Sequence, residues 1–262
     1  MTALLYSGSI MLILLSHEMG HYLTARKYGI EATLPYFIPM PLPPFGTMGA
    51  VIKMGGRIPN RRALFDVGAI GPLAGLAVTI PVIVVGLKLS TFIDAGTSDK
   101  DSFSLGTSLL LSLLSRLVLD PVPTGKILLL HPLAFAGWAG LFVTALNLLP
   151  IGQLDGGHIV YALFRKKSRW VSAIFYGLLI AVCLFMYFGW FLMAFLLILI
   201  RKHPPTQNDD MPLDAKRKVV GVFVLVVFLL SFTPVPFDFG GGLIPMLVKE
   251  LTPLFHKVLR LL

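Results

Sequence analysis

The stretch LLSHEMGHYL, residues 14–23, places two histidines and a glutamate inside a strongly apolar segment. Titratable side chains are costly in a lipid-embedded helix and usually indicate function there. The whole chain of 262 residues is 56% hydrophobic and only 13% charged, whereas soluble chains carry about 25% charged residues. The composition therefore predicts an all-α polytopic membrane protein.

We expect one membrane-embedded domain over residues 1–262, a bundle of about five to six transmembrane helices. Predicted spans cover about 3–26, 66–88, 127 or 132 to 149, and 219–232, with a helical hairpin turning near Gly189 within 170–200. Asp66 is a plausible N-cap of the second span. The hairpin is favoured because it brings all the strong basic clusters to one side of the membrane, the cytoplasm or a plastid stroma. A linker (about 90–126) with a short interfacial helix near Phe103–Leu119, a polar loop (201–218) and an interfacial tail (234–262) complete the prediction.

Residues 34–59 are rich in proline and glycine yet carry few charges. The prolines exclude a helix, and Thr47–Met54 has the pattern of a short strand or hairpin arm. Irregular backbone this apolar predicts a re-entrant β-hairpin buried against protein. It either holds substrate or is a packing plug with no substrate contact.

The net charge of +9 does not indicate nucleic-acid binding, because the basic residues form short clusters between apolar runs. Cys183 is the only cysteine, so an intrachain disulfide and a cysteine-based metal site are excluded. No cleavable signal peptide is evident at the start of the sequence.

His17, Glu18 and His21 fit the pattern H-E-x-x-H. On a helix, the two histidines share a face and their ring nitrogens can bind one metal ion, while the glutamate can reach a water on that ion. The alternative is that both histidines bond to the backbone or to each other in a bundle core. The motif lies about 10 Å below the basic face, as judged from the rise per helical residue.

A catalytic zinc needs three protein ligands and one open position. The second polar cluster in an apolar setting is NLLPIGQLDGGH, residues 147–158, where one proline and three glycines break the third predicted span. Asp155 is either the third ligand or the N-cap of the next short helix. The nearby H-E-x-x-H favours the ligand.

These paired motifs resemble the site-2 protease family of intramembrane zinc metalloproteases. GTMGAVIKM, GAIGPLAG and TPVPF are also similar to its prokaryotic and plastid branch, and the similarity runs from about Leu12 to Phe237. The resemblance implies one Zn²⁺ per chain, held by His17, His21 and Asp155, with Glu18 as general base. It also implies that Asn147 holds substrate or the transition state. His158 matches a motif position without a clear role.

The implied function is hydrolysis of locally unwound transmembrane segments of membrane proteins in a lipid bilayer. The predicted strand could hold such a segment by β-augmentation. The substrate-binding candidates are Thr47, Met48, Gly49, Ala50, Val51, Ile52 and Asn147. We expect an integral, multi-pass protein of a prokaryotic cytoplasmic membrane, with a plastid membrane as the alternative.

Two other functions stay open on the sequence. One is an intramembrane metal or proton-coupled transporter, although no internal repeat is found. The other is a catalytically silent relative that binds membrane proteins, against which the intact Glu18 argues. The chain departs from the family in starting too late to supply a span upstream of H-E-x-x-H, and no PDZ-like or cystathionine-synthase-type domain is found.

Overall fold

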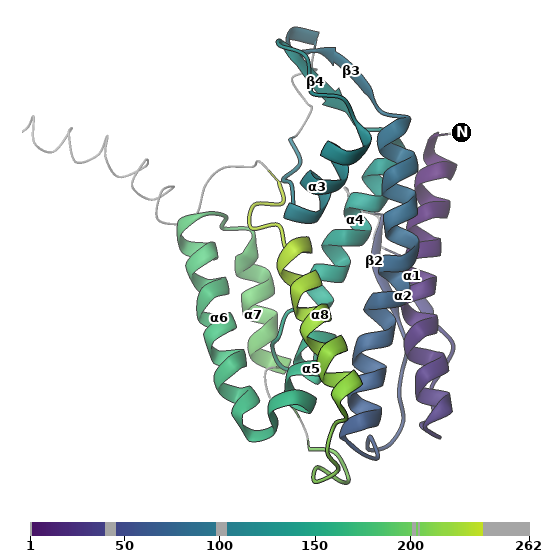
Figure 1. The fold of residues 1–262 in the computed structure, drawn as a ribbon, viewed down its shortest axis with the longest axis vertical. Helices are drawn as coiled ribbons and strands as arrows, with labels where there is room; N and C mark the ends of the chain where they lie inside the picture. Colours follow the sequence, from purple (N-terminus) through teal and green to yellow (C-terminus); the bar gives the residue numbers. More distant parts are fainter. Residues whose placement is uncertain (1, 40–45, 98–103, 201–202, 204, 238–262) are drawn as a thin grey trace, which may run out of the picture.

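The computed structural model describes residues 2–39, 46–97, 104–200, 203 and 205–237. Most of these residues are helical, and the longer helices run along the long axis of the molecule (Figure 1). In chain order, the α-helices of the described residues are α1 (Thr2–Lys27), α2 (Arg61–Lys88), α3 (Leu109–Val118), α4 (Pro132–Asn147), α5 (Asp155–Phe164), α6 (Ser168–Phe185), α7 (Trp190–Ile200) and α8 (Ala215–Ser231). Two small antiparallel sheets pair β1 (Tyr36–Pro39) with β2 (Thr47–Val51) and β3 (Thr91–Asp94) with β4 (Lys126–Leu129).

Three stretches among the described residues are long and apolar enough to cross a membrane: Thr2–Lys27, Arg61–Lys88 and Asp155–Phe185. The last of these joins α5, a 3-10 turn at Arg165–Lys167 and α6. Helices α3, α4 and α7 are apolar but shorter. The helical, membrane-associated character is therefore confirmed, whereas the predicted count of five to six spans is not.

Helices α1, α2 and α4 form the centre of the bundle, because α2 packs along both of the others. Trp138 of α4 is 2% exposed, and its indole nitrogen donates a hydrogen bond to the Gly106 carbonyl oxygen at 2.8 Å. Leu64 and Phe65 of α2 are also buried in this core. The packing brings the inner faces of α1, α2 and α4 together at the level of the H-E-x-x-H motif.

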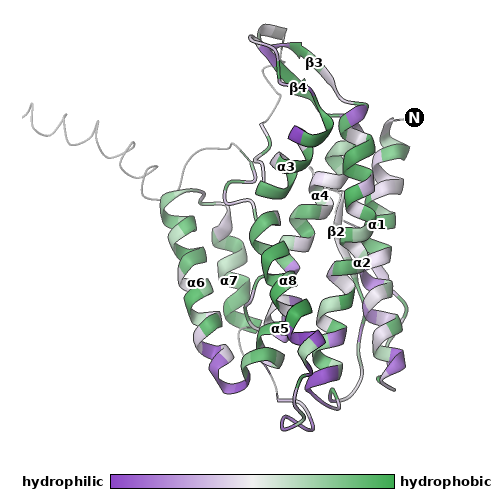
Figure 2. Ribbon diagram, viewed as in Figure 1, coloured by the Kyte–Doolittle hydropathy of each residue, from purple (hydrophilic) through white to green (hydrophobic). Residues whose placement is uncertain are grey.

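The predicted helical hairpin is confirmed, since α6 ends at Phe185, α7 begins at Trp190 and the two helices pack against each other. As a result, the ends of α1, α5 and α7 and the starts of α2, α6 and α8 lie at one end of the bundle, the lower end in Figure 1. Figure 2 shows hydrophilic residues at the lower ends of α1, α2, α6 and α8, and fewer at the opposite end, on α2 and α3. This arrangement agrees with the one-sided distribution of basic clusters.

The predicted N-cap at Asp66 is wrong. Helix α2 begins at Arg61, and the Asn60 side chain accepts a hydrogen bond from the Ala63 amide at 3.0 Å. Asp66 instead accepts hydrogen bonds from Arg217 of α8 at 2.8 and 2.6 Å. An aspartate near the start of a helix can either cap the helix or bind an arginine that is distant in the sequence. The local sequence does not distinguish these two roles.

Strands β1 and β2 form the predicted antiparallel pair, with Tyr36 opposite Val51 and Ile38 opposite Gly49. The predicted strand begins at Thr47 as expected and ends earlier, at Val51. Strand β3, inside the predicted linker, pairs with β4, which begins at the end of that linker, and Thr91 lies opposite Leu129 in this second antiparallel sheet. The strand β3 was predicted only as part of a linker, because four residues carry too little alternation to indicate a strand.

Two other boundaries differ from the prediction. Helix α8 begins at Ala215, inside the predicted polar loop, because Asp214 caps it by accepting from the Arg217 amide at 2.9 Å. Helix α3 is shorter than the predicted interfacial helix and begins after its cap, Ser108. The interfacial tail falls mostly outside the described residues, and the re-entrant placement of the first hairpin stays a prediction.

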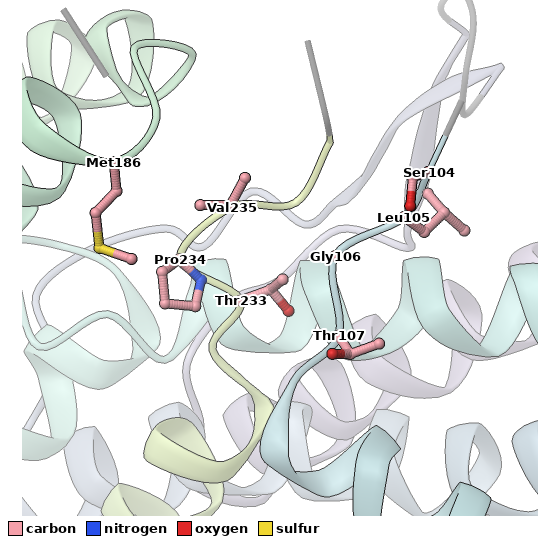
Figure 3. Close-up of a pocket in the computed structure, with 8 residues that line it drawn as sticks. All are labelled: Ser104, Leu105, Gly106, Thr107, Met186, Thr233, Pro234 and Val235. Carbon is pink, nitrogen blue, oxygen red and sulfur yellow. The ribbon is translucent and has the colours of Figure 1, made fainter. Parts of the chain in front are cut away.

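A cavity of about 330 Å³ opens at the end of the bundle away from the basic clusters (Figure 3). It lies between the segment before α3, the turn between α6 and α7, and the segment after α8. The lining residues are Ser104, Leu105, Gly106, Thr107, Met186, Thr233, Pro234 and Val235. None of the candidate site residues lines it, so this cavity is separate from the candidate site.

Candidate metal centre

His17 and His21 lie one turn apart on α1 and are both buried, with exposed fractions of 4% and 6%. Their Nε2 atoms are 3.0 Å apart. Both rings therefore face the same point inside the bundle, as the spacing of the motif predicts.

Asp155 reaches the same point from the first residue of α5. Its Oδ2 atom is 3.3 Å from the Nε2 atom of His17 and 3.3 Å from that of His21. Ligand atoms placed 2.0–2.1 Å from a tetrahedral zinc ion lie roughly 3.3 Å from one another. The three side chains are the group among the described residues that could hold a metal ion, and their donor set and spacing fit zinc.

The backbone of α2 orients the ring of His21. Nδ1 of His21 lies 2.8 Å from the Val67 carbonyl oxygen, which can only accept, so Nδ1 carries the proton. Nε2 of the neutral ring then presents its lone pair to the cluster. Such an outer hydrogen bond is the usual way in which a metal-binding histidine is fixed in tautomer and direction.

Two glycines of α2 make room for the histidines. A β-carbon built on Gly71 would lie 2.2 Å from Nε2 of His21, and one built on Gly75 would lie 3.2 Å from Cβ of His17. Any side chain at residue 71 would therefore overlap the imidazole. This role was not predicted from the sequence, since glycines four residues apart on an apolar helix more commonly indicate helix packing.

Asn147, the last residue of α4, borders the cluster from a third element. Its side-chain nitrogen is 3.2 Å from Nε2 of His17. The side chain is half-buried. An amide in this place can donate to an oxygen that approaches the metal-facing side of His17.

Glu18 is 8% exposed, and its carboxylate lies near the backbone N–H of Ile52, the residue that follows β2. It follows His17 directly on α1 and so lies beside the ligand face. A carboxylate in this position can hold a water molecule or a proton next to a bound metal.

Along β2 and the residues that follow it, the backbone N–H and C=O groups of successive residues point to opposite sides of the strand. Lys53 exchanges hydrogen bonds with Thr33, and the Gly55 amide donates to Glu31, so these odd-numbered residues face the β1 side. Ile52 faces the opposite side and reaches Glu18. Because direction alternates along a strand, the backbone groups of Ala50 also face away from β1. The described residues of β2 pair with no other strand on that edge.

The other hairpin candidates are placed differently. The Thr47 hydroxyl donates to the Ile38 carbonyl oxygen at 3.0 Å and accepts from the Gly49 amide, so it supports the hairpin itself. Gly49 has a φ of 108°, which a side chain would strain. Met48 and Val51 belong to β2. Their contact with a substrate is a proposal.

Comparison with known proteins fits this geometry. A model described as Peptidase family M50 matches residues 6–189 of the chain. The chain belongs to this family. The match contains both motifs and confirms the resemblance inferred from them.

Proteins of plants are among those similar to this chain. "Probable zinc metalloprotease EGY1, chloroplastic" of Arabidopsis thaliana is 38% identical over 169 residues, which cover 63% of this chain and 30% of the relative. "Probable zinc metalloprotease EGY2, chloroplastic" of Oryza sativa subsp. indica is 34% identical over 227 residues, 85% of this chain and 41% of the relative. The chain thus spans less than half the length of these relatives.

Proposed function

We propose that this chain is an intramembrane zinc endopeptidase that cleaves locally unwound transmembrane segments of membrane proteins. The observation that carries the proposal is the convergence of His17, His21 and Asp155, with Glu18 at their side. Membership of a peptidase family and relatives named as zinc metalloproteases support it.

The chemistry follows from the roles that the side chains can take. Zinc, when bound by the two histidines and Asp155, supplies an acidified water and polarises the scissile carbonyl. Glu18 accepts the proton from the attacking water and delivers it to the leaving amine. The Asn147 amide donates to the oxygen on which negative charge develops. The Val67 carbonyl oxygen keeps the proton of His21 on the nitrogen that faces away from the cluster.

The substrate has to be unwound, because a helix hides its carbonyl groups in its own hydrogen bonds. We infer that the free edge of β2 accepts the peptide as an added strand. Ala50 would supply the backbone N–H and C=O that pair with it, next to Glu18. The candidate residues Thr47, Met48, Gly49 and Val51 would shape this edge.

The membrane is part of the proposal. The three long apolar helices fit a chain embedded in a lipid bilayer. Relatives named as chloroplastic favour a plastid membrane, and they give no support to the prokaryotic cytoplasmic membrane predicted from the sequence. The membrane proteins cleaved there are the expected partners.

The transporter alternative is not favoured by the geometry. Glu18 lies beside the ligand cluster, where a carboxylate suits proton transfer from a metal-activated water, and both histidine ligands are buried. A catalytically silent relative that only binds membrane proteins would need neither the metal ligands nor Glu18 beside them.

A cleavage assay with a synthetic transmembrane peptide tests the proposal. We expect the purified protein in detergent to cut the peptide within its apolar segment, to lose activity with a zinc chelator, and to regain it with added zinc. N-methylation of one backbone amide beside the scissile bond should lower cleavage about tenfold, whereas methylation of the next amide, which faces the other way, should not. Activity that survives complete zinc removal would reject the zinc mechanism, and equal cleavage of both methylated peptides would reject the added strand.

A further inference from the structure

A second pair of histidines lies near the metal cluster and takes no part in it. His158 of α5 follows Asp155 by one helical turn, and its Nδ1 atom shares a hydrogen bond of 2.7 Å with Nε2 of His203. The two rings meet edge to face, with centroids 4.9 Å apart. His203 belongs to the connection between α7 and α8, far from α5 in the sequence.

His203 is itself held in place from α5. The ring of Tyr161 stacks on it at 4.2 Å between centroids and an interplanar angle of 11°. The Tyr161 hydroxyl donates to Asp209 at 2.6 Å, and the Thr206 hydroxyl donates to the same residue at 2.7 Å. Partial burial raises the pKa of Asp209, but these hydrogen bonds outweigh it and lower that pKa. Asp209 therefore stays a carboxylate that accepts hydrogen bonds.

The same connection is anchored to the start of α2. The amides of Gln207 and Asn208 donate to the carbonyl oxygens of Ile58 and Pro59, both at 3.0 Å. Arg62 donates to the Pro212 carbonyl oxygen at 2.9 Å. Residues 207–212 of this connection are therefore fixed to the bundle by bonds that do not involve His203.

The first turn of α5 depends on packing because it has no side-chain cap. Its N-cap residue, Leu154, makes no capping hydrogen bond. A β-carbon on Gly156 would lie 2.0 Å from the Leu148 carbonyl oxygen, so the turn sits directly on the broken connection before it. On another side, a β-carbon on Gly68 of α2 would lie 3.0 Å from Cβ of His158 and 3.2 Å from the Asp155 carbonyl oxygen.

We propose that His203, acting through His158, is a positioning residue that holds the first turn of α5 and thereby sets the Asp155 carboxylate against the two histidines of α1. The inference rests on the proposed metal centre and gives His158 the role that its motif position leaves open. A second metal site is not proposed, since the described residues bring no third ligand to this pair.

Zinc affinity of detergent-purified variants, measured by competition with a chelator, tests this role. His203→Phe keeps a ring to stack on Tyr161 but removes the nitrogen that bonds to His158, and we expect zinc to bind about tenfold more weakly. His203→Gln restores a group able to form that hydrogen bond and should bind within about threefold of the wild type.

Arg165→Gln is the matched control. It removes the exposed ion pair between Arg165 and Asp210 at 2.5 Å, which holds the same connection without touching the first turn of α5. Its zinc affinity should stay within about twofold of the wild type. Helix content and Tm of the zinc-free proteins establish that the variants fold, and His203→Ala replaces the phenylalanine variant if the latter does not.

The outcomes separate the inference from the proposed function. Unchanged zinc affinity in His203→Phe, or an equal loss in Arg165→Gln, would overturn the positioning role. A wild-type protein that binds no zinc would overturn the metal centre itself. Weaker zinc binding in His203→Phe with recovery in His203→Gln would support the role, whatever peptides the protein cleaves.

Discussion

Replacing Glu18 by glutamine is expected to reduce cleavage of a transmembrane peptide by about a thousandfold or more while zinc stays bound at the wild-type stoichiometry. Removing a general acid–base group typically costs 10²–10⁴-fold. Glutamine has the shape of glutamate, and its side-chain oxygen can take the same place beside the backbone N–H of Ile52. It cannot take a proton from water, so the loss should appear in the chemical step and not in folding or metal binding.

The matched control for this variant is Glu31→Gln, which makes the same change at an exposed residue of the loop after α1. It should cleave at the wild-type rate. Wild-type cleavage by Glu18→Gln would reject the general-base role. Loss of bound zinc from Glu18→Gln would show that this carboxylate serves the metal site in another way.

Adding a single methyl group at Gly71 is expected to weaken zinc binding by about a hundredfold, a loss of the size seen when the support of metal ligands is removed. The methyl carbon would lie 2.2 Å from Nε2 of His21, well inside contact distance. His21 cannot easily move aside, because its other nitrogen is bonded to Val67 of the same helix. Either the ring leaves the cluster or α1 and α2 separate, and both remove a ligand.

Gly177→Ala on α6 is the control for this second prediction, since a β-carbon there would meet nothing within 4 Å. It makes the same chemical change in an exposed helical turn and should leave zinc affinity unchanged, with a slight gain in stability. Zinc affinity of Gly71→Ala equal to that of Gly177→Ala would show that His21 does not occupy the place assigned to it.

The sequence predicted the metal cluster because both halves carry strong local signals. The two histidines of α1 are separated by one helical turn, and the costly placement of Asp155 in an apolar segment required a positive partner. The break at Pro150 and the glycines after it also marked the point at which a new helix begins. The structure brings these residues together as the motifs predict.

The supporting residues could not be predicted in the same way, because their roles depend on contacts distant in the sequence. Gly71 has the same local pattern whether it faces an apolar helix or an imidazole. His203 is an ordinary loop histidine until the fold places it against His158. Asp66 could cap a helix or bind Arg217, and only the packing of α8 decides between them.

X-ray absorption at the zinc edge of the wild type and of Asp155→Ala tests the central claim most directly. The wild type should show four nitrogen or oxygen ligands at about 2.0–2.1 Å, two of them imidazoles. Asp155→Ala should lose bound zinc or show an altered ligand set. An identical spectrum at one zinc per chain in both proteins would contradict the account, because the carboxylate of α5 would then not be a ligand.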